Sequence, residues 1–289
     1  MAASAASPMA VLRPGPLTSY WRFQRGVAKA QLAAWLPPER RLLIDISGPT
    51  AASSAQAAGR GHSVVRVIFG TRAEGAPGRA PLTAVHSGAD GSPRGGGRGA
   101  RSRAAAAARA GPPGRITQVL AEPGSLAFLA DGCADGVIAE DGALSRHLMS
   151  EDLAAEIARV LRPGGELLAC VDSLVLGMAI LAEQHHWAQL TDVPNAEVVL
   201  IPWPDGAITR SFGAAQLHDL LTEAGLEVGW IRPRTVLSPS MVDHVLRRDP
   251  GALARLVKAE LQAGQDGLAS VAPDESFGIS LITAARKPG

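Results

Sequence analysis

The sequence predicts an α/β fold: a doubly wound, mostly parallel, seven-stranded sheet with helices on both faces. Three observations carry this prediction. An apolar strand, a glycine turn, a helix and a valine-rich strand follow one another within residues 42–69, which is one β–α–β unit. Strand and helix patterns then alternate along the rest of the chain. The strands are continuous apolar runs, as in parallel sheets that are covered on both faces.

The first helix is predicted from Thr18, where apolar residues begin to recur every three or four positions, and it ends before the prolines at Pro37. The strand Leu42–Ile46 follows and breaks at a glycine turn. A helix over Ala51–Ala58 then leads to a strand over Ser63–Phe69. These elements form the first half of the predicted sheet.

The later strands are short apolar runs bounded by glycine, proline or polar residues. They are expected over Ile116–Leu120, Asp135–Ala139, Glu166–Val171, Leu226–Ile231 and Phe277–Ala285, with a hairpin formed by Val198–Ile201 and Ala207–Arg210. The later helices are expected over Glu151–Leu161, Leu174–Trp187 and Gly213–Ala224, with two short ones within Pro239–Ala263. Ser150 is expected to cap the first of these helices and Asp172 the second.

Domain organisation is predicted from shifts in composition. Residues 1–16 are small and punctuated by proline, which favours disorder, and residues 17–289 are expected to form one domain. A low-complexity insertion at 71–114 interrupts that domain; 34 of its 44 residues are Gly, Ala, Arg or Pro. Its seven arginines and two acids leave two interpretations, a disordered connection or a basic arm that binds RNA or phosphate. No aromatic residues lie among the arginines to stack on bases, which favours the first interpretation.

The composition excludes several function classes. A net charge of +1 provides no field that would attract nucleic acid or an anionic membrane, and no Gly-Lys-Ser/Thr phosphate loop occurs. Cys133 and Cys170 form no CxxC pair, and we expect no metal site. No apolar run reaches the roughly 18–20 residues of a membrane span, and the first residues do not resemble a secretory signal. We therefore expect a soluble, cytoplasmic protein, whose Ala/Gly/Pro/Arg bias is typical of high-GC bacterial coding sequences.

Two segments carry a resemblance to a known family. Residues 154–168 contain a helix, the turn Arg162-Pro163-Gly164-Gly165 and a strand, and residues 126–138 precede them at the matching distance. Together with residues 42–67, they resemble class I S-adenosylmethionine-dependent methyltransferases of the type 11 kind. The resemblance covers roughly 18–70 and 115–235, and weakly the final strand. It implies a Rossmann-like methyltransferase fold, S-adenosyl-L-methionine as cofactor, methylation of a small-molecule acceptor, and neither nucleic acid nor membrane as partner.

The resemblance also implies where the cofactor binds. The candidate cofactor-binding residues follow the predicted strands or lie on the first helix: Tyr20, Asp45, Ser47, Gly48, Pro49, Thr50, Glu122, Ser125, Leu126, Glu140 and Asp141. Asp45 stands out because a carboxylate at the end of an apolar strand is costly without a partner. The alternative for Asp45 is a cap for the next helix. Tyr20 could equally be a core aromatic residue.

The sequence departs from the family pattern at two places. The loop after the first strand has one glycine, Gly48, where the family has several. The acid that the family uses for the ribose hydroxyls is expected near Ile68, and no acid is present there. Loss of such a charge-assisted hydrogen bond costs on the order of 1.5–3 kcal/mol of binding free energy.

Histidines are the candidate catalytic bases, because methyl transfer to a hydroxyl or amine benefits from a proton acceptor. His147 follows the fourth strand and His186 follows the helix after the fifth, and the alternative for each is a surface histidine. Two other functions compete with methyl transfer. One is a catalytically inactive, methyltransferase-like binding or regulatory protein. The other is a nicotinamide-dependent oxidoreductase, which requires a Gly-x-Gly-x-x-Gly turn that is absent.

Overall fold

The computed structural model describes residues 18–70, 114–203, 205–266 and 278–289. The predictions for residues 1–16 and for all but the last residue of 71–114 therefore lie outside the described residues. The strands are β1 (Leu42–Asp45), β2 (Ser63–Phe69), β3 (Ile116–Ala121), β4 (Ala134–Ala139), β5 (Leu161–Asp172), β6 (Val199–Pro202), β7 (Ile208–Ser211), β8 (Glu227–Pro233) and β9 (Ser280–Arg286).

The helices cover the sheet or extend from its ends. They are α2 (Thr18–Trp35), α3 (Ala52–Gly59), α5 (Ala143–Arg146), α6 (Ser150–Val160), α7 (Leu174–Glu183), α8 (Trp187–Asp192), α9 (Ala214–Glu223), α10 (Pro239–Arg248) and α11 (Leu253–Asp266), with short 3₁₀ turns at Val193–Asn195 and Pro250–Ala252. In the described part of the chain, no helix combines the length and the apolar character that a membrane crossing requires.

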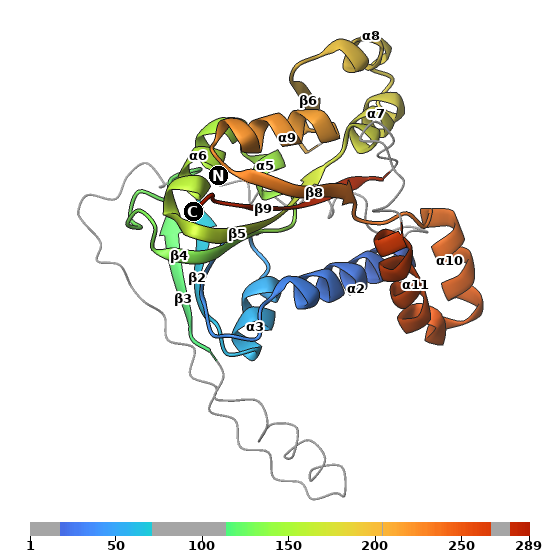
Figure 1. Ribbon diagram of the computed structural model, residues 1–289. Coiled ribbons are helices and arrows are strands. Elements are labelled where there is room, and N and C mark those ends of the chain that lie inside the picture. Colours follow the sequence, from blue (N-terminus) through green and yellow to red (C-terminus); the bar gives the residue numbers. More distant parts are fainter. Residues whose placement is uncertain (1–17, 71–113, 204, 267–277) are drawn as a thin grey trace, which may run out of the picture.

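The predicted fold class is confirmed. Seven strands form one sheet in the order β3-β2-β1-β4-β5-β9-β8, in which only β9 runs antiparallel to its neighbours (Figure 1). The chain moves from β1 outward to β3, then returns and continues from β4 in the other direction. The strand order therefore reverses between β1 and β4, the place where open α/β sheets bind ligands at the carboxyl ends of their strands.

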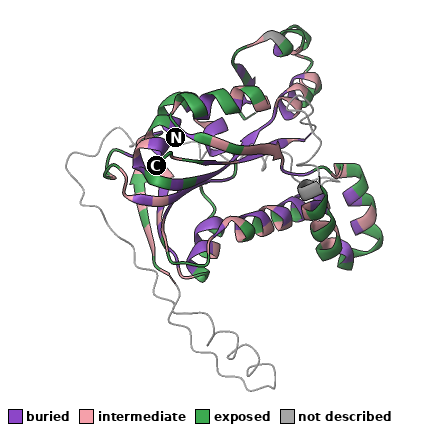
Figure 2. Cartoon of the chain, in the orientation of Figure 1, coloured by how far each residue is buried: buried purple, intermediate pink, exposed green. Residues whose placement is uncertain are grey.

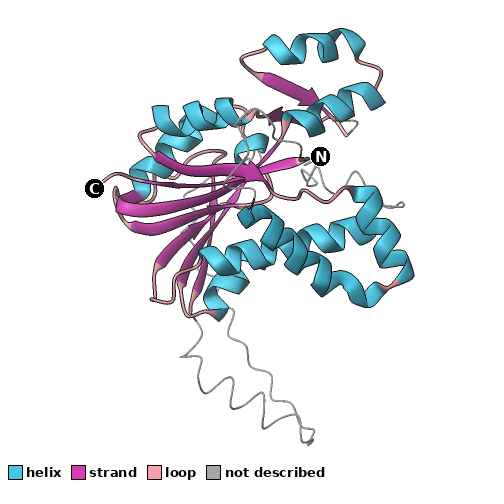
Figure 3. Ribbon diagram, turned by 45° about the vertical axis from the view of Figure 1, so that its right-hand side comes forward, coloured by secondary structure: helices cyan, strands magenta, loops and turns pink. Residues whose placement is uncertain are grey.

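Successive apolar side chains point to opposite faces of the sheet and build two cores. Helices lie on both faces of the sheet (Figure 3). Ile44 and Val137 pack in the same core as residues of α6 and α9, whereas Leu43 and Ile138 pack with residues of α2 and α3. All four are at most 1% exposed, and burial of each stabilises the fold by roughly 1.5–3 kcal/mol. Figure 2 shows the buried residues along the strands and along the sheet-facing sides of the helices.

Several helix boundaries differ from the predictions for local reasons. Ser150 does not cap α6, because its hydroxyl donates to the carbonyls of Leu144 and His147 instead. Ser173, not Asp172, caps α7 by accepting a hydrogen bond from Leu176 N. The helix predicted over 174–187 is two helices, because a left-handed residue, His185 (φ +60°), separates α7 from α8.

The first helix joins the sheet to the C-terminal helices. Tyr20, Phe23 and Val27 of α2 are at most 1% exposed and pack against Val242 of α10 and Val257 of α11. The two short helices predicted within Pro239–Ala263 are present as α10 and α11. Ser238 caps α10 by accepting from Met241 N at 3.3 Å, and Pro239 occupies its first position.

Candidate functional site

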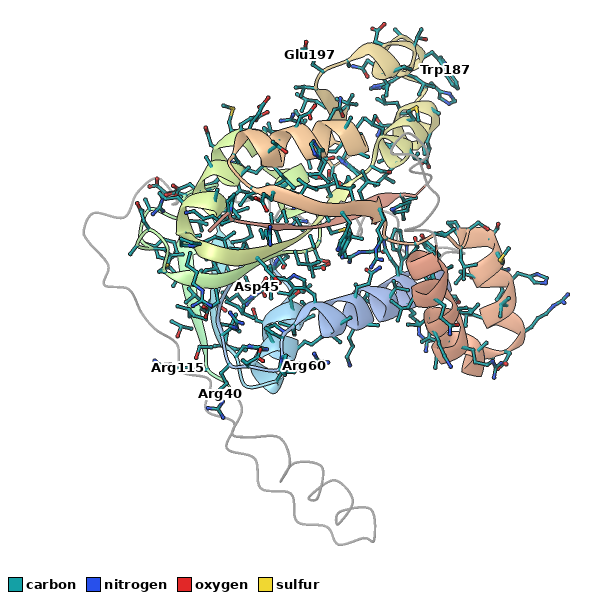
Figure 4. The ribbon with its side chains drawn as sticks, viewed as in Figure 1. Arg40, Asp45, Arg60, Arg115, Trp187 and Glu197 are labelled. Carbon is teal, nitrogen blue, oxygen red and sulfur yellow. The ribbon has the colours of Figure 1, made fainter. Side chains whose placement is uncertain are left out.

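The loop after β1 is held by the carboxylate of Asp45, which is 1% exposed. One oxygen, Oδ1, accepts a hydrogen bond from Ser47 N at 3.0 Å, and Oδ2 accepts a short hydrogen bond from Ser54 Oγ in α3. Gly48 follows with a φ of +109°, a conformation that side chains disfavour. Figure 4 places Asp45 inside the molecule, where the sheet meets α2 and α3. Asp45 thus orders the loop and bonds to a side chain of the following helix.

Two contacts join the loop after β1 to the loop after β4. Ser47 Oγ accepts from Glu140 N at 3.0 Å, and Thr50 Oγ1 donates to Asp141 Oδ2 at 3.1 Å. Pro49, between them in the β1 loop, is exposed. The structure therefore brings together the candidate residues Asp45 to Thr50 and Glu140 to Asp141 at the switch point of the sheet.

Arg146 lies across both loops. Its Nη2 donates to Ser47 O at 3.0 Å and its Nη1 to Asp141 O, so the guanidinium is hydrogen-bonded to one carbonyl from each loop. A Cβ placed on Gly48 would lie 2.7 Å from Arg146 Nη2, so the single glycine of the loop makes room for this guanidinium. Burial lowers the pKa of Arg146, against the opposing effect of the nearby Asp141 and Asp172.

A second arginine supports the same loop from β2. Arg66 is 7% exposed, donates to Gly48 O at 3.2 Å and to Pro49 O, and also donates to Gln118 Oε1 on β3 at 2.8 Å. The carboxyl end of β2 beyond it is apolar: Ile68 pairs with Leu120, which is 71% exposed. Among the described residues, no acid lies at this end of β2.

Buried charges lie at the carboxyl ends of β4 and β5. Glu140 Oε2 is 2.5 Å from Arg234 Nη2, which follows β8. The other oxygen, Glu140 Oε1, and Asp172 Oδ2 at the end of β5 have no hydrogen-bond partner among the described residues. Burial raises the pKa of Glu140, although Arg234 opposes this, and raises the pKa of Asp172 to about 6.

The start of α2 reaches the same edge of the sheet. The Tyr20 hydroxyl is 2.9 Å from Thr235 Oγ1, next to Arg234, and Gln24 donates to Ser280 Oγ at the start of β9. Tyr20 is 1% exposed and burial raises the pKa of its hydroxyl. Tyr20 therefore joins α2 to the carboxyl edge as a core residue, beside the ring of Trp21.

The loop after β3 contains the candidates Glu122, Ser125 and Leu126. Glu122 is exposed, and its carbonyl accepts from Ser125 N at 3.1 Å. The backbone of Leu126 has partners on α6: its N–H donates to Glu156 Oε2 at 2.9 Å, and its carbonyl accepts from Arg159 at 3.0 Å. Of the three, Ser125 is the residue that remains half-buried without a partner on α6.

The two candidate bases lie in different places. His147 ends α5, and its ring covers Gly124 so closely that a Cβ there would lie 2.2 Å from Nε2. Burial lowers the pKa of His147, which leaves the ring neutral at pH 7. His186 precedes α8, where its Nδ1 is 2.8 Å from Gln189 Oε1, beside the exposed Trp187 at the outer tip of the molecule (Figure 4). The structure thus brings His147, but not His186, to the loops after β3 and β4.

A cavity of about 750 Å³ lies elsewhere, on the α2 face of β5, β9 and β8. Trp35, Leu168, Trp230 and Ile282 are among the residues that line it. The described residues contain no group of three or more His, Cys, Asp or Glu side chains that could hold a metal ion.

Sequence reasoning missed Arg146, Arg234 and Asp172 as residues of this edge. Asp172 offered a signal, an acid at the end of an apolar strand, but it was interpreted as a helix cap. Arg146 and Arg234 offered none, because a single arginine after a short helix or strand is common on protein surfaces.

Known proteins resemble this chain in structure rather than in sequence. No protein-family model matches the chain, and no curated protein sequence matches it. A solved structure from Listeria monocytogenes, assigned as an S-adenosylmethionine-dependent methyltransferase, is similar over 92% of this chain and 98% of its own, with 12% identity and a TM-score of 0.53. Phosphoethanolamine N-methyltransferase 2 of Haemonchus contortus, in complex with S-adenosyl-L-methionine, is similar over 91% of this chain and 52% of its own, with 13% identity and a TM-score of 0.51.

A third structure is 1,6-didemethyltoxoflavin-N1-methyltransferase of Burkholderia thailandensis, with 17% identity, coverage of 100% and 94%, and a TM-score of 0.48. At such identities the comparisons show the fold alone. The chain has the fold of S-adenosylmethionine-dependent methyltransferases, as its sequence resemblance implied.

Proposed function

We propose that this chain is an S-adenosylmethionine-dependent methyltransferase that acts on a small-molecule acceptor. The observation that carries the proposal is the loop after β1, where Asp45 orders Ser47 and the left-handed Gly48 faces the switch point of the sheet. The Haemonchus enzyme, which shares the fold, holds S-adenosyl-L-methionine and is named for a small-molecule acceptor. These points support a cofactor site at the carboxyl ends of β1 and β4.

The residues at this edge fit one end of the cofactor. S-adenosylmethionine has an amino-acid group with an ammonium and a carboxylate, next to a positively charged sulfonium. The edge offers the guanidinium of Arg146 and two buried carboxylates, Glu140 and Asp172, each with an oxygen that has no partner among the described residues. Opposite charges at one edge suit a ligand that itself has both charges.

The ribose end of the cofactor finds fewer polar groups. Ile68, Phe69 and Leu120 form an apolar end of β2 and β3 where the family has an acid. We expect this to weaken cofactor binding by roughly ten- to a hundredfold relative to a site with that acid. The amino-acid end of the cofactor then supplies a larger share of the binding free energy.

The bound cofactor supplies a methyl group already activated by its sulfonium. The chain has to position the acceptor and accept its proton. His147 is the better placed of the two candidate bases, because its neutral ring lies between the loops after β3 and β4. Trp203 is buried in the turn of the β6–β7 hairpin, and Trp187 is exposed at the tip, away from this edge.

A second function has an observation in its favour. The Thr50–Asp141 hydrogen bond and the Arg146 guanidinium connect the loops after β1 and β4 across the space between them. In addition, the described end of β2 has no acid. These features favour a methyltransferase-like protein that binds a ligand or a partner without methyl transfer. An oxidoreductase with a dinucleotide is not favoured, because β9 is antiparallel and the glycine-rich turn is absent.

Calorimetry with S-adenosylmethionine and S-adenosylhomocysteine tests the proposed function. We expect the wild-type chain to bind both, and Asp45→Ala to abolish binding while lowering the free energy of unfolding by about 1–3 kcal/mol. Ser54→Ala is the matched control, since it removes one hydrogen bond of Asp45 and keeps the carboxylate. No detectable binding by the wild-type chain at about 1 mM cofactor, or equal binding by Asp45→Ala, would contradict the proposal.

A further inference from the structure

The cavity of about 750 Å³ on the α2 face of the sheet is separate from the proposed cofactor site. Its volume lies within the roughly 300–1,000 Å³ of pockets that bind small molecules. Leu168 of β5 and Ile282 of β9 line it from the sheet, and Trp35 of α2 and Leu261 of α11 line it from the helices. The loops after β1 and β4 contribute none of its described lining residues. The cavity is therefore available to a second ligand.

Two indole rings form aromatic walls of this cavity. Trp35 and Trp230 both line it, and both pack against the apolar cluster that contains Leu168 and Ile282. The ring of Trp35 extends to β4, where a Cβ placed on Gly136 would lie 3.1 Å from its Cη2. The missing side chain at Gly136 thus makes room for this ring. Indole rings that packing holds in position favour a flat ring as ligand, because aromatic rings pack offset or edge to face.

The guanidinium of Arg232 provides a positive charge at one end of the cavity, which it lines from β8. Its Cζ lies over the ring of Trp230, 4.3 Å from the ring centroid. This contact positions the guanidinium without neutralising it. The N–H groups at the edge of a planar guanidinium match the two oxygens of a carboxylate. Burial lowers the pKa of Arg232, and a bound anion would favour its charged form.

The acids of the lining lie toward the opposite end of β8. Glu227 begins this strand, whereas Arg232 lies next to its last residue. The Glu227 carboxylate is 2.6 Å from Nη2 of Arg286, which is opposite Glu166 in the pairing of β5 with β9. Both acids of the lining therefore lie near another arginine and away from Arg232. The cavity has an apolar, aromatic middle and a cationic end.

We propose that this cavity binds a flat aromatic molecule with one carboxylate, its ring against Trp35 and Trp230 and its carboxylate on Arg232. The two indole walls favour an aromatic ring over a flexible aliphatic chain, because rigid rings lose little conformational entropy when they pack together. The inference goes beyond the proposed function, since it concerns a second site on another part of the sheet and needs no cofactor.

The test uses 2-naphthoate and 2-naphthamide, which share the ring system and differ in charge. Calorimetry with the full chain is expected to show that the wild type binds 2-naphthoate more tightly than 2-naphthamide. Arg232→Gln should weaken 2-naphthoate binding by roughly tenfold or more and leave 2-naphthamide unchanged. Ala284→Phe places a ring inside the cavity and should abolish binding of both compounds. Arg248→Gln, on the exposed end of α10, is the matched control and should change neither affinity.

The outcomes keep this inference apart from the proposed function. Saturating S-adenosylhomocysteine should not displace 2-naphthoate; displacement would place the compound in the cofactor site and overturn the inference. Absence of 2-naphthoate binding at about 1 mM, or equal affinity of wild type and Arg232→Gln, would also overturn it. Tighter binding of decanoate than of 2-naphthoate would overturn the aromatic assignment.

A second variant covers the case in which Arg232→Gln fails to fold by circular dichroism. Arg232→Lys keeps the charge and loses the planar guanidinium. We expect it to weaken 2-naphthoate binding by a smaller factor and to leave 2-naphthamide unchanged. An unchanged ratio between the two affinities would overturn the inference.

Discussion

Glu140 and Arg234 form a buried ion pair, 2.5 Å from Oε2 to Nη2, with 5% and 4% of their side-chain surfaces exposed. Glu140 follows β4 and Arg234 follows β8, and β5 and β9 lie between these strands in the sheet. The pair therefore spans the carboxyl edge beneath the proposed site. Gln31 of α2 adds a further contact, donating to Arg234 O at 3.2 Å.

Breaking this pair from one side should destabilise the fold. Arg234→Met leaves the Glu140 carboxylate buried without its counter-ion, and we expect the free energy of unfolding to fall by about 3–5 kcal/mol in urea titrations at pH 7.5. The loss should be smaller at pH 5, because burial raises the pKa of Glu140 and the protonated acid needs no counter-ion. Arg286→Met is the control, since it breaks an exposed pair with Glu227 and should cost under about 1 kcal/mol. Equal losses in the two variants would contradict this account.

Asp172→Asn should stabilise the chain in a pH-dependent way. The pKa of Asp172 is raised to about 6 from an ordinary value of 3.8, so between these values the folded chain binds more protons than the unfolded chain. Stability therefore falls as the pH rises through this window, and the full penalty, about 3 kcal/mol, is present above pH 6. Asparagine removes the penalty.

The measurement is the melting temperature of wild type and Asp172→Asn from pH 4 to pH 8. The difference between the two melting temperatures should be largest above pH 6 and should decrease toward pH 4. Asp192→Asn, at an exposed position at the end of α8, should show no such pH-dependent gap. A gap that grows as the pH falls would have the wrong sign for a buried, unpaired carboxylate.

Gly48→Ala should damage the loop after β1. The φ of +109° is strained for alanine, and the new Cβ would lie 2.7 Å from Arg146 Nη2. We expect a loss of about 1–2 kcal/mol in the free energy of unfolding and a loss of S-adenosylhomocysteine binding. Gly59→Ala, at the end of α3 with no atom within 4 Å of the new Cβ, should be neutral or slightly stabilising. Unchanged ligand binding in Gly48→Ala would show that the loop does not approach the ligand.

Ile68→Asp tests the apolar end of β2 by gain of function. If the cofactor lies across the carboxyl ends of β1 and β2, a carboxylate at this position can accept the ribose hydroxyls, and affinity for S-adenosylhomocysteine should rise by roughly tenfold or more. Leu120→Asp, on the paired and exposed position of the edge strand, is the control for added charge. An equal rise in both variants would indicate a general electrostatic effect.

The sequence by itself determined the sheet and its helices. Continuous apolar runs predict buried strands, three-to-four spacing predicts helices, and the loop from Asp45 to Thr50 could be located because a glycine turn after an apolar strand is a local pattern. Predicted helix caps were wrong where a side chain bonds to a partner that no local pattern shows. The hydroxyl of Ser150, for example, donates to the carbonyls of Leu144 and His147.

Only the tertiary structure determined which charged side chains lie together at the carboxyl edge. Arg146, Asp172 and Arg234 come from separate elements, and the distance from Ser47 to Arg146 along the chain is 99 residues. The sheet order places the ends of β1, β4, β5 and β8 on one edge, where burial removes solvent and makes each charge depend on its neighbours. Local patterns predict which residues are apolar, but the partners of a buried charge are set by which strand ends become neighbours when the chain folds.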